Sequence, residues 1–309
     1  MKLCLTIDCD SDFVRNPREK DAITWNGAKH GLPRLMSTLM QWCEHAGIRL
    51  SVVLFVRSDD QVAYCLGRHA ELFARIFRNA KQEKWDIDSE IEWAWHPHLY
   101  EFQTSGFWEL SLADEKQREQ LVRTYAALSN EGWHPAVSRI GECLFSEQIL
   151  NTLVELGIQV DSTALPGRIN AGTDWANAPS DPYFPDRNDF KSFGDSAILE
   201  VPFSMVPIRA PCENLSRLRY INLVNNIQFQ RDGLIGLSMS RKTIVVIVHA
   251  YEYLALCEGW PDRHPLWGGA RSLIENLDCI RYSCLRNGDC FELTTLSKIR
   301  LDYEKAFRN

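Results

Sequence analysis

Two pairs of side chains with reactive chemistry stand out in this sequence of 309 residues. Asp8 and Asp10 are separated by one residue, and so are His96 and His98. Residues i and i+2 of an extended chain point to the same side, so each pair can face a common site. Carboxylates and imidazoles are metal ligands and proton carriers at neutral pH. If the two pairs meet, the sequence predicts a site for acid–base or metal-assisted chemistry.

Arg139 and His249 extend this pattern, because each lies at the end of a short apolar segment, as the two pairs do. In a parallel α/β barrel, the carboxyl ends of the strands gather at one mouth, where the active site is built. Four predicted strands end in reactive side chains, in the order Asp, His, Arg, His. We therefore expect these residues to share one site at the mouth of a barrel.

The elements that must position these residues are visible as alternating apolar segments. Short runs rich in β-branched residues alternate with longer segments of helical period, which indicates βαβ units and a parallel sheet. The predicted strands are 3–8, 49–56, 90–96, 136–140, 159–163, 198–204 and 243–250, with a further candidate at 290–293. The predicted helices are 32–43, 68–84, 113–131, 146–156, 213–231, 270–286 and 295–307. Ser146 is expected as an N-cap and Gly47 as a C-terminal cap.

The segment 166–194 interrupts the alternation with Gly, Pro, Asn and Asp. It is too long for an ordinary connection, and such loops are usually functional. Elsewhere the chain shows no break in composition and no internal repeat. The sequence therefore predicts a single α/β barrel domain over residues 1–309.

Composition limits the partners and the location of the protein. The 34 Lys and Arg residues against 41 Asp and Glu give a formal net charge of −7, which argues against a nucleic-acid ligand. The longest apolar runs are far shorter than the roughly 20 residues of a membrane span. The start of the chain becomes acidic at Asp8, before a signal peptide could form. We expect a cytoplasmic protein whose ten cysteines are mostly reduced thiols.

Five motifs resemble those of the polysaccharide deacetylase (NodB-homology) family, in the same order along the chain. They are Thr-Ile-Asp-Cys-Asp at 6–10, His-Pro-His-Leu-Tyr at 96–100, Arg-Ile-Gly-Glu at 139–142, Val-Asp-Ser-Thr at 160–163 and Ile-Val-His at 247–249. The family usually spaces its two histidines four residues apart, whereas here they are two apart. The closer spacing resembles variants from bacterial surface-polysaccharide clusters. The resemblance implies a distorted (β/α)7 barrel.

The resemblance also assigns roles to the strand-end residues. A divalent metal ion, zinc in the first instance, would be held by Asp10, His96 and His98. Asp8 would be the general base, oriented and kept in its charged form by Arg139, while His249 would protonate the departing amine. Three carboxylates are candidates to orient His249, namely Glu142, Asp161 and Asp174. Tyr100, Tyr183 and Trp267 are candidates for contact with a sugar, because aromatic faces stack on sugar rings.

The implied function is a metal-dependent hydrolase that removes an N-acetyl group from a sugar. The substrate would be a lipid- or nucleotide-linked saccharide precursor in the biosynthesis of a bacterial surface polysaccharide, either O-antigen or capsule. The alternative is a catalytically inactive relative that binds a sugar or assists assembly. The altered histidine spacing favours this alternative, whereas the presence of Asp8, Arg139 and His249 favours an enzyme.

Overall fold

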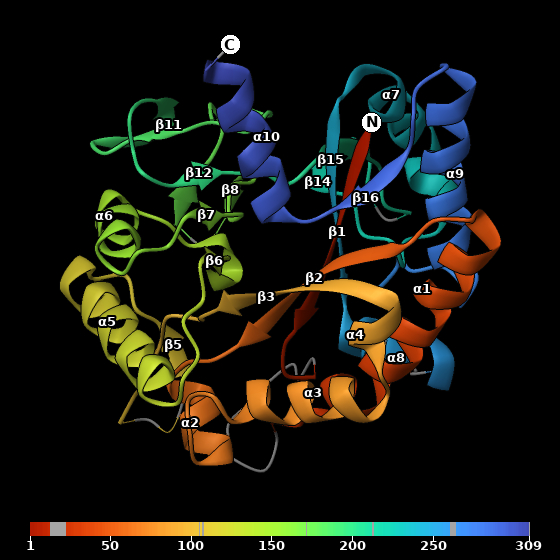
Figure 1. Cartoon of the computed structure of the whole chain (residues 1–309). Coiled ribbons are helices and arrows are strands. Elements are labelled where there is room, and N and C mark those ends of the chain that lie inside the picture. The colour runs from red at the N-terminus through yellow and green to blue at the C-terminus, as the bar shows by residue number, and fades with distance from the viewer. Residues whose placement is uncertain are drawn as a thin grey trace.

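The structure is a computed structural model that describes residues 1–12, 23–104, 106, 108–170, 172–211, 213–259 and 264–308. At its centre lies a curled sheet of eight strands. These are β1 (Lys2–Cys9), β2 (Leu50–Arg57), β3 (Ser89–His96), β6 (Val137–Ser138), β7 (Val160–Asp161), β12 (Leu199–Glu200), β15 (Thr243–His249) and β16 (Glu292–Thr294). The strand order is β12-β7-β6-β3-β2-β1-β15, with β16 paired to the start of β1 (Figure 1).

Every strand pair in this sheet is parallel. The seven strands predicted from the sequence and the candidate at 290–293 each overlap one of these strands. β12 and β15, the first and last strands in this order, are not paired with each other directly. Irregular segments lie between them and bond to β15: Val245 N donates to Ser204 Oγ at 2.9 Å, and Ile247 N donates to Ile221 O at 3.0 Å. This irregular seam distorts the barrel, and the predicted distorted (β/α)7 barrel is confirmed.

The barrel is buried on both faces, which explains why its strands read as nearly continuous apolar runs. All eight residues of β2 are buried. Val53 and Phe55 belong to an inner cluster with residues of the other strands, and Leu296 and Ile299 pack into the same cluster. The helix α10 (Leu296–Arg308), which carries the last two, lies near the ends at which the strands begin (Figure 1). The opposite end of the barrel, where the strands finish, holds the reactive residues.

Helices surround the sheet. They are α1 (Leu32–Ala46), α2 (Asp60–Leu66), α3 (Glu71–Gln82), α4 (Trp85–Asp88), α5 (Asp114–Asn130), α6 (Glu147–Glu155), α7 (Ile227–Ser240), α8 (Ala250–Glu258) and α9 (Ser272–Arg286), together with α10. The predicted caps are confirmed: Ser146 Oγ accepts from Ile149 N at 3.2 Å, and Gly47 has a φ of 68° at the end of α1. Local sequence therefore determines where these two helices stop and start.

The predicted helix over 213–231 is wrong in its first part. The chain there forms β14 (Arg217–Tyr220), which pairs antiparallel with β13 (Met205–Ile208). The helix α7 begins only at Ile227, where the Asn226 side chain accepts from Gln228 N at 3.0 Å. A partner strand from earlier in the chain overrides local helix propensity, which sequence periodicity does not detect.

The described part of the long segment 166–194 folds into two hairpins. They are β8 (Ile169–Asn170) with β9 (Thr173–Asp174), and β10 (Pro185–Asp186) with β11 (Asp189–Phe193). Trp175 lies 5.3 Å from Phe145 and 4.8 Å from Phe190 between ring centroids, and all three rings are buried. A further hairpin joins β4 (Tyr100–Phe102) to β5 (Trp108–Leu110). Aromatic packing therefore orders a segment whose composition indicates a loop.

Two expectations from composition can be compared with the described residues. Eight described cysteines carry free thiols, namely Cys4, Cys9, Cys43, Cys143, Cys257, Cys279, Cys284 and Cys290. None of the described helices is both long enough and apolar enough to cross a membrane.

Candidate active site

Asp10, His96 and His98 converge at the carboxyl ends of β1 and β3, which are separated in the sheet only by β2. Asp10 Oδ1 lies 3.3 Å from Nε2 of each histidine, and the two Nε2 atoms are 3.2 Å apart. Asp10 Oδ1 is buried and has no hydrogen-bond partner. The three residues therefore form a compact cluster of one oxygen and two nitrogen atoms.

The donor set of this cluster fits a divalent metal ion. His96 Nδ1 lies 2.7 Å from Arg139 O, so Nδ1 donates its proton there and the lone pair of Nε2 faces Asp10. A lone pair and a carboxylate oxygen repel each other unless a cation stands between them. Such a hydrogen bond to the far ring nitrogen is typical of histidines that bind metals. One carboxylate and two imidazoles suit zinc and similar ions, and they leave positions open for other ligands.

The three residues of this cluster shift one another's pKa. Burial disfavours the Asp10 carboxylate, but attraction to His96 and His98 outweighs it and holds the pKa of Asp10 well below its usual range. Burial also disfavours the charged form of His96, but Asp10 and Asp8 outweigh it and raise the pKa of His96. For His98, burial and the charge of Arg57 together lower the pKa. Positive charge at Nε2 of His96 therefore stabilises the cluster.

His98 lies beyond the end of β3, so contacts other than strand pairing must hold it. Its ring stacks on Tyr100, with centroids 5.8 Å apart and planes 19° apart. On Gly141, an added Cβ would lie 2.3 Å from the ring carbons Cγ and Cδ2 of His98. The His98 backbone N–H donates to Asp59 Oδ2 at 3.0 Å. Only a glycine at position 141 leaves room for the ring in this place.

Asp8 and Arg139 form a buried ion pair beside the cluster. Arg139 Nη1 lies 2.7 Å from Asp8 Oδ1, and the guanidinium also donates to Thr6 Oγ1 and Ser162 O. Its central carbon lies 3.9 Å from the ring centroid of Phe55 and 4.2 Å from that of Phe203. The arginine is thus held between two aromatic faces, where its planar cation is favourable. The other oxygen, Asp8 Oδ2, faces the cluster and lies 3.6 Å from His96 Nε2.

His249 lies opposite Asp8 in the register of β1 and β15. Its Nε2 is 3.9 Å from Asp8 Oδ2, and its Nδ1 is 2.9 Å from Glu252 Oε2. Glu252 is in turn held by Asn222 Nδ2, which donates to both of its oxygens at 2.9 and 3.0 Å. Burial opposes the charged imidazole, but the attraction of Glu252 outweighs it and raises the pKa of His249 to about 10.

The carboxylate beside His249 is therefore Glu252 and none of the three candidates from the sequence. Glu142 accepts from the Tyr100 hydroxyl at 3.1 Å, and Asp174 accepts from Ala176 N at 2.9 Å. Asp161 accepts from Ser138 Oγ at 2.6 Å. The signal for Glu252 was its position three residues after His249 at a helix start, since the structure shows this pair as a capping box on α8.

Asp161 has a different partner, Glu200, which is its register neighbour on β12. Both carboxyl groups are fully buried, and Glu200 Oε1 accepts from the backbone N–H groups of Thr163 and Ala164. Burial raises the pKa of both groups, and the charge of Asp161 raises that of Glu200 further. Two buried carboxyl groups this close favour sharing a proton.

The three aromatic candidates for substrate contact lie in different surroundings. Tyr100 is partly exposed and covers His98, so it borders the cluster. Tyr183 is completely buried, and its hydroxyl donates to Phe190 O at 2.8 Å. This placement contradicts the predicted substrate contact of Tyr183, because the ring packs in the core. Trp267 is partly buried in the segment between α8 and α9, where it forms a bridge with Asn225.

Sequence reasoning also missed the charged residues that end β2. Arg57 is buried, and its Nε lies 2.6 Å from Asp59 Oδ2. The signal was present, because Arg57 directly follows the apolar run 50–56 and Asp59 follows two residues later. Unlike the strand ends at Asp8, His96, Arg139 and His249, this one repeats no motif of the family, so its sequence alone does not single it out.

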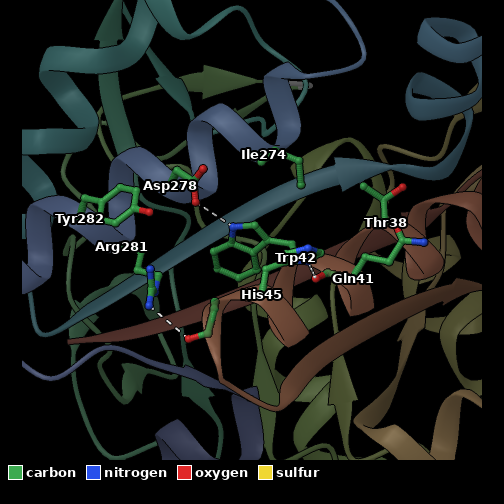
Figure 2. Close-up of a pocket in the computed structure, with 9 residues that line it drawn as sticks. Thr38, Gln41, Trp42, His45, Ile274, Asp278, Arg281 and Tyr282 are labelled. Atoms are coloured by element: carbon green, nitrogen blue, oxygen red, sulfur yellow. Dashed lines mark hydrogen bonds between the residues drawn. The ribbon is translucent and has the colours of Figure 1, made fainter.

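A separate hollow of about 360 Å³ lies between α1 and α9 (Figure 2). Trp42 forms part of its wall and donates from Nε1 to Asp278 Oδ1 at 2.9 Å. Arg281 donates to Ala46 O at 3.1 Å, which ties α9 to the end of α1. These contacts join two helices on the outside of the barrel, and none of the strand-end residues lines this hollow.

Comparison with known proteins supports the fold. No family model matches the sequence, and no curated protein matches it. Among solved structures, a putative glycoside hydrolase/deacetylase from Parabacteroides distasonis superposes with a TM-score of 0.56 at 13% identity, over 98% of this chain and 70% of that chain. A putative polysaccharide deacetylase from Mycobacterium smegmatis superposes with a TM-score of 0.51 at 16% identity, over 99% of this chain and 91% of that chain. The motifs and the architecture thus agree, and this chain has the fold of the polysaccharide deacetylases.

Proposed function

We propose that this protein is a metal-dependent N-deacetylase that acts on an N-acetylated sugar. The observation that carries the proposal is the arrangement of two proton-transfer groups beside one cation-binding cluster. Asp8 Oδ2 lies 3.6 Å from His96 Nε2, within the cluster, and 3.9 Å from His249 Nε2. A base, an acid and a metal-binding set are thus brought to one mouth by three different strands.

The reaction is the hydrolysis of an acetamide. A divalent ion bound by Asp10, His96 and His98 would polarise the carbonyl and lower the pKa of a water molecule. Asp8 would accept a proton from the water as its oxygen attacks the carbonyl carbon. Arg139 holds Asp8 in place and leaves Oδ2 free for this transfer. His249 would then donate a proton to the nitrogen as the C–N bond breaks, which yields acetate and a free amine.

The state of His249 supports its role as the acid. With a pKa raised to about 10, the ring is protonated at neutral pH and has a proton to give. Glu252 Oε2 lies 2.9 Å from Nδ1, and Nε2 is directed to the side on which Asp8 lies. The acid that we propose therefore lies 3.9 Å from the carboxylate oxygen of the base that we propose.

The substrate we propose is a lipid- or nucleotide-linked saccharide in the biosynthesis of a surface polysaccharide, O-antigen or capsule. The support for this finer assignment is the histidine motif, which resembles variants from such clusters. We further propose zinc as the metal and the cytoplasm as the location, and the free thiols of Cys4, Cys9, Cys43 and the other buried cysteine, Cys284, agree with that location.

Acetate release from N-acetylated sugar precursors by the zinc-loaded protein tests the proposal. Asp8→Asn keeps the shape of the side chain but removes the proton acceptor, so kcat should fall by about 10²- to 10⁴-fold. His249→Ala should lower kcat similarly. The kcat of the double variant should be only a little lower than that of the less active single variant. Asp174→Asn is the matched control, because Asp174 is exposed and its carboxylate contacts Ala176 N and Lys191 Nζ, outside the cluster. Undiminished acetate release by both single variants would place the chemistry elsewhere.

The alternative function is sugar binding without catalysis, which the short histidine spacing favours. In that case the zinc-loaded wild-type protein would bind an N-acetylated sugar but release no acetate. Asp8→Asn and His249→Ala would then alter affinity alone. The enzyme is favoured over this binder because Asp8 lies close to both His96 and His249.

A further inference from the structure

The buried pair Arg57 and Asp59, at the end of β2, lies next to the candidate metal cluster. Asp59 accepts three contacts: Arg57 Nε at 2.6 Å and the His98 backbone N–H at 3.0 Å on Oδ2, and the Val62 N–H at 3.0 Å on Oδ1. Both side chains are almost completely buried. One carboxylate therefore connects the end of β2, the start of α2 and the backbone of His98.

His98 needs such an anchor because of its position in the chain. His96 is the last residue of β3 and is held by strand pairing, whereas His98 follows Pro97 outside the strand. Pro97 has no backbone N–H to donate, so the next donor along the chain is that of His98. That N–H group donates to Asp59, and this hydrogen bond connects the end of β2 to the end of β3.

Arg57 in turn fixes Asp59 and reaches the aromatic wall of the site. Its guanidinium lies 5.9 Å from the ring centroid of Tyr100 and 5.7 Å from that of Trp25. It also donates to Gln61 and, at 3.4 Å, to Ser11 Oγ. Tyr100 is the ring that stacks on His98. The arginine therefore supports His98 from two directions, through Asp59 at the backbone and through Tyr100 at the ring.

We propose that Arg57 and Asp59 are positioning residues that orient His98 as a metal ligand. They do so because His98, two residues after His96, lies outside β3. The inference rests on the proposed metal site. Neither residue supplies an atom to the cluster, and their contribution is the placement of the His98 backbone and ring. Partners of this kind behind a metal ligand typically change metal affinity by about 10- to 100-fold.

The decisive variant is Asp59→Ser. Serine is a good N-cap, so α2 keeps its cap, but its side chain is too short to serve Arg57 and His98 as well. Asn226→Ser is the matched control, since it makes a similar exchange of cap at the start of α7. Arg57→Lys is a second variant, which keeps a positive charge but loses the planar guanidinium whose Nε binds Asp59.

The measurement is the Kd of the full chain for Zn²⁺, by competition with a chelating indicator, with the thermal unfolding midpoint of each metal-free variant alongside. We expect Asp59→Ser to weaken Zn²⁺ binding by about 10- to 100-fold, with an altered Co²⁺ absorption spectrum. Arg57→Lys should show a smaller loss and Asn226→Ser none. Wild-type affinity and spectrum in Asp59→Ser, even with a lower midpoint, would overturn the inference and leave the proposed function intact. A wild-type chain that binds no Zn²⁺ would refute both, whereas zinc binding without acetate release would refute only the function.

Discussion

Replacing Glu252 by Gln should lower the pKa of His249. Burial disfavours the charged ring, and the attraction of Glu252 is the largest influence that raises its pKa to about 10. Gln removes the negative charge 2.9 Å from Nδ1 but keeps an oxygen that can accept from Asn222. The variant therefore tests charge with little change of shape.

The size of the effect follows from the separation of the charges. Two unit charges about 4 Å apart interact by about 4 kcal/mol at the effective dielectric of a protein, which corresponds to about 3 pKa units. Opposite charges at such distances usually shift a pKa by about 1 to 3 units. We therefore expect the pKa of His249 to fall by about 1 to 3 units in the variant.

The direct assay is an NMR titration of the imidazole, with His249 assigned by its loss in His249→Asn. Glu258→Gln is the control, because Glu258 lies on the same helix and is exposed. For an active enzyme, the alkaline limb of kcat against pH should move in the same direction and by a similar amount. An unchanged pKa in Glu252→Gln, or an equal shift in the control, would refute the electrostatic role of Glu252.

The same ion pair has a consequence for stability. The folded pKa of His249, about 10, is raised above that of an unfolded histidine, so the stability it contributes is complete below about pH 6.5 and is lost as pH rises through the folded pKa. In Glu252→Gln this pH dependence should be smaller, and the loss of unfolding free energy should be greatest at low and neutral pH. Chemical denaturation at pH 6 and at pH 10 measures both values.

Three further outcomes are expected. His96→Ala should abolish most Zn²⁺ binding while the chain stays folded, since a strand-end ligand is not part of the core; full zinc content by elemental analysis would refute the assignment. Gly141→Ala should weaken Zn²⁺ binding by about 10-fold or more, because the new Cβ would meet the His98 ring at 2.3 Å, and calorimetric titration measures the change. Glu200→Gln should raise the unfolding free energy above neutral pH. Burial and Asp161 raise the folded pKa of Glu200, so wild-type stability declines as pH rises from the unfolded pKa of about 4.3 through the folded one; melting curves from pH 5 to 9 that are identical for both proteins would contradict this.

Strand prediction succeeded because the strands of this barrel are buried on both faces. The unbroken apolar runs 52–56 and 244–248 lie within β2 and β15 for that reason. Helix prediction failed in the first part of 213–231, where the four residues of β14 pair with 205–208, whereas 227–231 are helical as predicted. Nothing local distinguishes this segment from a helix start, since the hydrogen bonds that decide its conformation come from another part of the chain.

The candidate site shows the same division between local and distant information. The i, i+2 spacing of Asp8 with Asp10, and of His96 with His98, is that of side chains on one face of an extended chain, so the sequence indicates which side chains can point the same way. Asp10 and His98 themselves lie just beyond the ends of β1 and β3, where contacts from other segments hold them. The pairing of His249 with Glu252 is also local, because three residues separate them at a helix start. Such relations depend only on the period of a helix or strand, and a sequence carries that period explicitly.

Only the tertiary structure decided which distant groups meet. Arg139 reaches Asp8 across 131 positions of sequence, Asp59 reaches the His98 backbone across 39, and Glu200 lies beside Asp161 rather than in the site. Tyr183 belongs to the core although its residue type suits a sugar. These outcomes depend on the order and register of the parallel strands. That order and register are determined by the packing of the whole sheet and not by any one segment. The sequence by itself therefore determined the chemistry available at each strand end, and the closure of the barrel determined which of those ends act together.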